Sequence, residues 1–158
     1  MLRWQTILLL GLDNEPQPDA LLRIDEACGG QSRIGEDDYV EGAPELIVEI
    51  AASSASYDLH DKLRVYRRNG VLEYIVWQIA EQKVSWFSLQ AGDYINLPPS
   101  DTGVICSRIF PGLNLNVTAL LSSDLAGVLT EVQKGMATEA HQLFVEQLTQ
   151  QRLHRHSD

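Results

Sequence analysis

The chain has 158 residues, of which 44% are hydrophobic and 22% charged, and its formal net charge is -10. This length and composition are those of a globular protein that can bury a full core. The 22 acidic residues against 12 basic ones argue against the broad basic surface that gives non-specific nucleic-acid affinity, because that affinity comes from Lys and Arg neutralising phosphates.

The cysteines and the hydropathy pattern both favour a cytoplasmic protein. Cys28 and Cys106 stand far apart without a metal-ligand spacing, so the sequence suggests neither a zinc site nor a disulfide framework. The apolar segment 7–12 is too short to cross a membrane, and no membrane association is expected. We expect this segment to belong to a first strand over residues 2–12.

Apolar and turn-forming residues alternate along the rest of the first two thirds of the chain. A polar loop is predicted over 26–42, and a helix is predicted from Ser56 or Asp58 to about Arg68. The remaining predicted strands cover residues 20–24, 46–50, 71–79, 83–89, 94–97 and 104–109.

The last part of the chain has apolar residues at helical spacing. Helices are predicted over 119–129 and 132–153, which places the domain boundary so that residues 1–121 form the main domain and 122–158 a C-terminal helical extension. The extension is too polar to be buried all round. We therefore expect one face to pack on the domain or on a partner, and we expect a homodimer.

Two short apolar runs carry acids at positions that can meet. Asp19 opens the run that ends at Ile24, and Glu49 lies near the end of the run that starts at Pro44. If the runs pair as antiparallel strands, Asp19 lies beside Glu49. Two buried acids on adjacent strands are costly unless a positive group lies between them, and a divalent metal is one candidate. For Glu49, a buried salt bridge to Lys62 without a metal is the alternative.

Several linked segments resemble the PD-(D/E)xK, restriction-endonuclease-like superfamily. Within it the chain is most similar to a large bacterial family of predicted endonucleases whose substrate is not established. The resemblance covers most of the chain, roughly 18–121. The segments are Pro18-Asp19, Gly42-Ala43-Pro44-Glu45-Leu46-Ile47-Val48-Glu49, Ser53-Ser54-Ala55-Ser56, Asp61-Lys62 with Tyr66, Gly70-Val71-Leu72-Glu73-Tyr74 and Ile109-Phe110-Pro111-Gly112-Leu113.

The resemblance implies an α/β (α+β) fold with a mixed central sheet flanked by helices, and hydrolysis of nucleic-acid phosphodiester bonds with Mg2+ or Mn2+. Asp19 and Glu49 correspond to the metal-binding acids. The motif lysine is expected two residues after Glu49, where this chain has Ala51. In the most similar family the lysine stands on the following helix, which assigns the catalytic lysine to Lys62. We expect DNA rather than RNA as the substrate.

Three further residues are candidates for the surroundings of this site. Glu45 shares a strand face with Glu49, but four strand residues separate them by about 13 Å, so one ion cannot bridge them. We interpret Glu45 as a supporting acid. Tyr66 is interpreted as a core residue whose hydroxyl fixes Lys62 or a carboxylate, and Gln78 as a residue lining the site at the end of its strand.

The sequence is also compatible with two functions other than that of a metal-dependent nuclease. One is a degenerate, non-catalytic family member in which Glu49 and Lys62 form a salt bridge and the domain serves as an assembly or regulatory partner. The other is a protein-binding module whose acidic loop, Glu36 to Glu41, recognises a basic partner. Metal affinity would distinguish the nuclease from both.

Overall fold

The computed structural model describes residues 2–4, 8–9, 17–52 and 56–155. These residues form two compact units, Met1–Ile95 and Asn96–Asp158. The boundary between these units lies upstream of the domain boundary predicted at residue 121. The predicted limits of the main domain stay a prediction. The expected α+β class with a mixed central sheet and flanking helices is confirmed.

The first unit is built on a six-stranded sheet in the order β1-β3-β6-β7-β8-β9. Strands β6 and β7 are parallel, whereas β1–β3, β3–β6 and β7–β8 are antiparallel pairs. A smaller sheet pairs β2 with β5 and β5 with β4. The strands are β1 (Leu2–Trp4), β2 (Leu8–Leu9), β3 (Ala20–Leu22), β4 (Arg33–Ile34), β5 (Val40–Glu41), β6 (Leu46–Ala51), β7 (Glu73–Gln78), β8 (Lys83–Gln90) and β9 (Asp93–Asn96).

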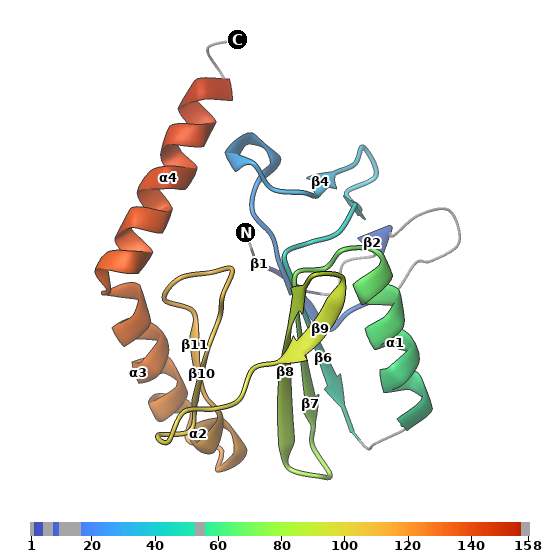
Figure 1. Ribbon diagram of the computed structural model, residues 1–158, viewed down its shortest axis with the longest axis vertical. Helices are drawn as coiled ribbons and strands as arrows, with labels where there is room; N and C mark the ends of the chain where they lie inside the picture. Colours follow the sequence, from blue (N-terminus) through green and yellow to red (C-terminus); the bar gives the residue numbers. More distant parts are fainter. Residues whose placement is uncertain (1, 5–7, 10–16, 53–55, 156–158) are drawn as a thin grey trace. The chain divides into compact units, whose positions relative to one another are not determined.

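Helix α1 (Ser56–Arg68) connects the parallel strands β6 and β7 and lies beside the sheet (Figure 1). It ends before Gly70, whose φ of 80° is a left-handed conformation that stops a helix at low cost. The predicted end at Arg68 is confirmed, whereas the side chains of the two predicted caps, Ser56 and Asp58, lie outside the described residues. The ends of β6 and β7 lie at the same edge of the sheet (Figure 1).

One face of the sheet carries both the core and the candidate acids. Leu21, Ile47, Tyr74 and Val76 are buried on this face, where they cluster with Tyr66 of α1. Because side chains alternate along a strand, the residues two positions away from these have the same orientation. Asp19, Glu49 and Gln78 therefore project on the face that α1 covers.

The second unit contains a β-hairpin and three helices. Strands β10 (Val104–Cys106) and β11 (Asn114–Asn116) are antiparallel, and α2 (Val117–Leu121), α3 (Leu125–Met136) and α4 (Glu139–Arg155) follow. None of the described helices combines the length and hydropathy that a membrane span requires. Cys28 and Cys106 are both free thiols. The expected cytoplasmic location stays a prediction.

Three predicted boundaries in the second unit were wrong. The strand predicted over 104–109 ends at Cys106, because the Ser107 hydroxyl accepts hydrogen bonds from the amides of Ile109 and Phe110 and turns the chain. The structure has three helices where two were predicted, because polar side chains cap the N-termini of α3 and α4. Asp124 accepts a hydrogen bond from the amide of Gly127, and Thr138 accepts one from the amide of His141. Apolar periodicity continues across these caps and did not reveal them.

The described part of the first predicted strand consists of two separate short strands, β1 and β2, which belong to different sheets. The rest of that prediction falls outside the described residues. The strand predicted over 20–24 ends at Leu22, and a short 3-10 helix, Glu26–Cys28, follows. It begins where the Asp25 side chain accepts a hydrogen bond from the amide of Ala27, which explains the early end of the strand.

Candidate active site

The expected opposition of Asp19 and Glu49 is present. Ala20 pairs with Val48 in the antiparallel ladder, which places the preceding Asp19 across from Glu49. The amide of Ile50 donates a 2.6 Å hydrogen bond to Oδ2 of Asp19, so this carboxylate is fixed beside the end of β6. Asp19 is exposed, whereas Glu49 is only 5% exposed. The pair thus has one carboxylate in the core and one at the surface.

Helix α1 supplies two donors to Glu49. Nζ of Lys62 lies 2.9 Å from Oε2 of Glu49, and the hydroxyl of Tyr66 donates a 2.6 Å hydrogen bond to Oε1. Lys62 and Tyr66 are four residues apart and therefore share one side of the helix. The Lys62 side chain is 31% exposed, so its ammonium group is within reach of solvent and of a ligand at the surface.

Tyr66 is fully buried, and its pKa is raised strongly, first by burial and then by the neighbouring negative charge of Glu49. The phenol is therefore protonated at neutral pH and donates its hydrogen to Glu49. Its ring packs 5.2 Å from the ring of Tyr74, centre to centre. Packing and hydrogen bonding together hold one Glu49 oxygen in a fixed orientation.

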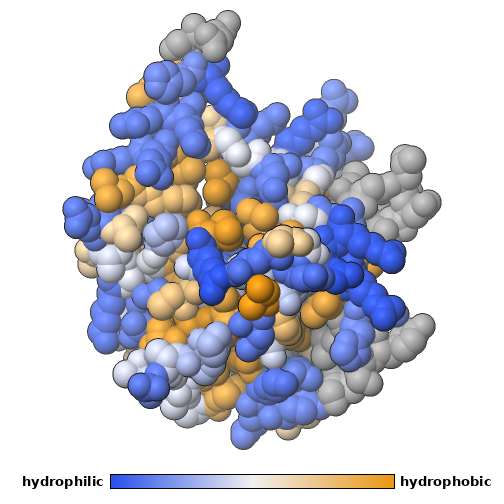
Figure 2. All heavy atoms as spheres, viewed as in Figure 1, coloured by the Kyte–Doolittle hydropathy of each residue, from blue (hydrophilic) through white to orange (hydrophobic). Residues whose placement is uncertain are grey.

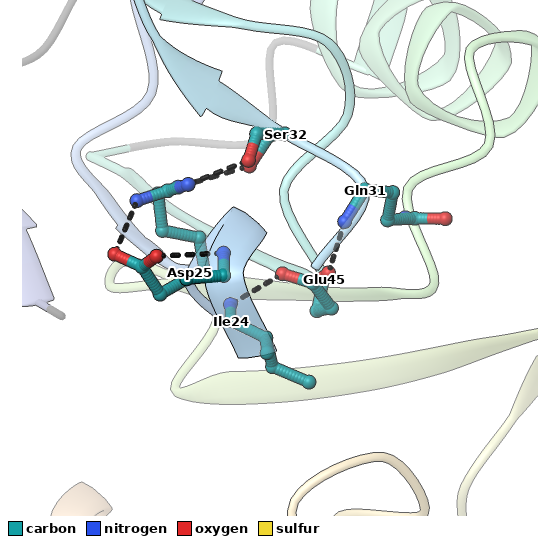
Figure 3. A network of polar contacts seen from close by, with 7 residues as sticks. Ile24, Asp25, Gln31, Ser32 and Glu45 are labelled. Atoms are coloured by element: carbon teal, nitrogen blue, oxygen red, sulfur yellow. Dashed lines mark hydrogen bonds and ion pairs between the residues drawn. The ribbon is translucent and has the colours of Figure 1, made fainter. Parts of the chain in front are cut away.

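Glu45 is buried at the opposite end of β6, where it anchors a loop (Figure 3). Its Oε2 accepts a 2.7 Å hydrogen bond from the amide of Ile24, and its Oε1 accepts a 3.0 Å bond from the amide of Gln31. In the same network the buried Arg23 donates to Oγ and the carbonyl oxygen of Ser32. These contacts favour an anchoring function for Glu45; its interpretation as a supporting acid of the site stays a prediction.

Gln78 is the last residue of β7 and pairs with Ala51 in the parallel ladder. It is half-buried and has the same orientation as Glu49. Ala51 is the position at which the superfamily motif would place its lysine. The Gln78 side chain therefore lies next to the position at which the motif lysine is replaced by alanine. That Gln78 lines the site stays a prediction.

Two carboxylates form the acidic part of the candidate metal site. Within the described part of the chain, no group of three or more His, Cys, Asp and Glu side chains could hold a metal. Mg2+ commonly uses one or two protein carboxylates and completes its shell with water and substrate phosphates. Each carboxylate oxygen can accept more than one contact, so the bonds from Lys62 and Tyr66 leave Glu49 able to coordinate. The donor set therefore fits Mg2+ or Mn2+.

The acidic loop is partly neutralised by its own contacts. Nε of Arg33 donates a 2.7 Å hydrogen bond to Oε2 of Glu41, and this carboxylate raises the pKa of Arg33. A cavity of about 310 Å³ in this region is lined by both charges and by Gln31 and Ser32. The cavity does not include Asp19, Glu49 or Lys62. The mixture of charges does not favour a purely cationic partner at this loop.

The fold, the opposed acids and the nearby lysine define a restriction-endonuclease-like protein. The chain belongs to the Uma2 family, described as "putative restriction endonuclease", whose family model matches residues 2–118. A solved structure with a similar fold is the crystal structure of "a putative nuclease belonging to DUF820" from Anabaena variabilis. It shares 17% identity and a TM-score of 0.56 over 77% of this chain and 67% of that chain. No curated protein matches the chain.

Proposed function

We propose that the protein is a metal-dependent endonuclease that hydrolyses phosphodiester bonds of nucleic acid, with DNA rather than RNA as substrate and Mg2+ or Mn2+ as cofactor. The observation that carries the proposal is the position of Asp19 opposite Glu49 on the neighbouring strand, with Lys62 of α1 bonded to Glu49. Membership of the Uma2 family supports the reaction class. Family membership does not specify the type of nucleic acid or the metal, which are therefore proposed.

Each residue has a distinct task in this reaction. Asp19 and Glu49 would hold the metal ion, which when bound polarises the phosphoryl oxygen and activates water. Tyr66 keeps Glu49 oriented. Lys62, whose ammonium group is partly exposed beside Glu49, would donate its hydrogens to a phosphate oxygen on which negative charge grows.

The charge of the chain restricts how it can hold nucleic acid. A net charge of -10 repels an extended phosphate chain at low salt, so binding has to depend on a few cations and on the metal near the site. We therefore expect weak binding without a divalent ion. This expectation also separates the protein from nucleases that hold DNA by a broad basic surface.

Metal binding is the direct test of the proposal. We expect Mn2+ to bind wild-type protein at a single site and Glu49→Gln to weaken this affinity at least about tenfold, because one of two carboxylate ligands is lost. Isothermal titration calorimetry measures both values. Glu36→Gln is the matched control, since it removes the same charge from an exposed position. Equal Mn2+ affinity in wild type and Glu49→Gln would contradict the assignment.

One observation favours a second candidate function. Glu49 is almost fully buried and both of its oxygens already have donors, an arrangement that is also satisfied without metal. A non-catalytic member of the family that serves as an assembly or regulatory protein would retain this salt bridge. Absence of Mn2+ binding together with absence of cleavage of DNA and RNA by wild type would select this candidate.

We also propose that the protein forms a homodimer through its C-terminal helices. Helix α4 exposes Leu143, Val145 and Leu153 among hydrophilic side chains, which dominate its visible surface (Figure 2). Sedimentation equilibrium should show a dimer for wild type and a shift toward monomer for Leu143→Glu, because a buried charge without a partner opposes association. Gln142→Glu adds the same charge at a polar exposed position and should remain dimeric. A monomeric wild type refutes the proposal.

A further inference from the structure

Strands β6, β7 and β8 place three residues in one row at the edge of the sheet that carries the candidate site. Ala51 pairs with Gln78 in the parallel ladder, and Gln78 pairs with Lys83 in the antiparallel ladder. The adjacent row contains Glu49, Val76 and Ser85 by the same pairing. Lys83 therefore stands in the row in which the superfamily motif would place its lysine, two strands away from the empty position.

Lys83 projects on the same side of the sheet as the acids. Paired residues of neighbouring strands share a face, and Glu49, Gln78 and Lys83 are related by pairing or by steps of two residues. Lys83 is exposed, and no described carboxylate forms an ion pair with it. Lys83 is thus a cation without a described protein partner, and it lies beside the site at which a negatively charged substrate is expected to bind.

We propose that Lys83 binds a backbone phosphate of the substrate close to the scissile bond, which extends the proposed nuclease function and rests on it. Two strand spacings separate Ala51 from Lys83, a distance of about 10 Å. Successive phosphates of a duplex strand are separated by a rise of about 3.4 Å along the helix axis and also by a rotation around it, so this straight distance corresponds to neighbouring phosphates of one strand. Lys62 and Lys83 would then contact different phosphates of one strand, with Gln78 between them.

This assignment makes a specific prediction for salt dependence. A lysine that neutralises one phosphate contributes about 0.9 to the slope of log affinity against log salt for a B-form duplex, and about 0.7 for a single strand. The contact reads no base, so its loss should weaken binding equally for different sequences. In a protein with few phosphate contacts, each contact contributes a large fraction of the total slope of log affinity against log salt.

The experiment compares Lys83→Gln with Arg64→Gln in the full chain. Arg64 is exposed on α1 and lies between Lys62 and Tyr66 in sequence, so it projects from the other side of the helix. Both variants remove one positive charge. Fluorescence anisotropy would measure the affinity for a short labelled DNA duplex, and for its single strand, over a series of salt concentrations with Ca2+ at fixed concentration.

We expect Lys83→Gln to lower duplex affinity about five- to tenfold near 0.1 M salt and to reduce the slope by about 0.9, whereas Arg64→Gln leaves the slope unchanged. Equal slopes for wild type and Lys83→Gln, or equal losses in both variants, would overturn the assignment. Wild-type protein that binds neither probe would overturn it as well. Binding with the expected slope change but without Mg2+-dependent cleavage would uphold Lys83 and reject only the catalytic proposal.

Discussion

Lys62→Ala is expected to lower the rate of metal-dependent cleavage by about 100- to 1000-fold, by analogy with the loss of one preorganised donor to a developing oxyanion. The reason is local. Ala51 leaves the usual lysine position empty, and the nearest described cation to Glu49 is Lys62, at 2.9 Å. Single-turnover cleavage of labelled DNA with saturating Mg2+ measures the chemical step without a contribution from product release.

The same substitution also removes an ion pair, so its effect on folding has to be measured separately. Glu49 would keep Tyr66 as donor but lose its charged partner, which should lower the free energy of unfolding by about 1–3 kcal/mol. Circular dichroism during urea unfolding gives this value, and cleavage is then assayed where each variant is folded. Arg64→Ala removes a charge from another side of α1 and should keep the wild-type rate.

Lys62→Arg separates charge from geometry. Arg keeps a positive charge beside Glu49, but its planar guanidinium replaces a compact ammonium group. We expect stability close to that of wild type and a cleavage rate between those of wild type and Lys62→Ala. A Lys62→Ala protein that cleaves at the wild-type rate would show that Lys62 is structural. The Glu49–Lys62 salt bridge would then be part of the core and not of the reaction.

The sequence was sufficient to predict the opposition of Asp19 and Glu49, because the two apolar runs could pair antiparallel in only a few registers that bury their side chains. Family resemblance was needed for Lys62, since a lysine on a helix is ordinarily solvated. The contact of Tyr66 with Glu49 was predicted only as one of two possibilities, because the hydroxyl was expected to fix Lys62 or a carboxylate. Its confirmation required the orientation of α1 against the sheet, which local periodicity does not specify.

Other parts of the site depend on pairing that sequence patterns do not contain. Lys83 opens an ordinary-looking strand, and only the register across β6, β7 and β8 relates it to Ala51. Glu45 resembled a site acid because it shares a face with Glu49. The structure shows its two oxygens accepting from backbone amides of a distant loop, a contact that depends on tertiary folding.

The second unit contains a close backbone contact that allows a stringent test of its packing. A Cβ built on Gly135 of α3 would lie 2.0 Å from the carbonyl oxygen of Gly112, so this approach is possible only for glycine. The same turn is held by α4: the Phe110 and Phe144 rings pack edge to face, and Nδ1 of His141 lies 2.8 Å from the carbonyl oxygen of Pro111. Because that oxygen can only accept, Nδ1 carries the proton.

Gly135→Ala should therefore lower the free energy of unfolding by about 3 kcal/mol, at the upper end for overpacking, because a backbone carbonyl and not a flexible side chain has to move. Helix propensity alone predicts the opposite sign, a gain of about 1 kcal/mol for alanine over glycine. Urea unfolding followed by circular dichroism distinguishes these outcomes. Gln133→Ala, at an exposed position of the same helix, should change stability by less than about 0.5 kcal/mol. A Gly135→Ala protein as stable as wild type would mean that the turn at Gly112 does not pack against α3 in solution.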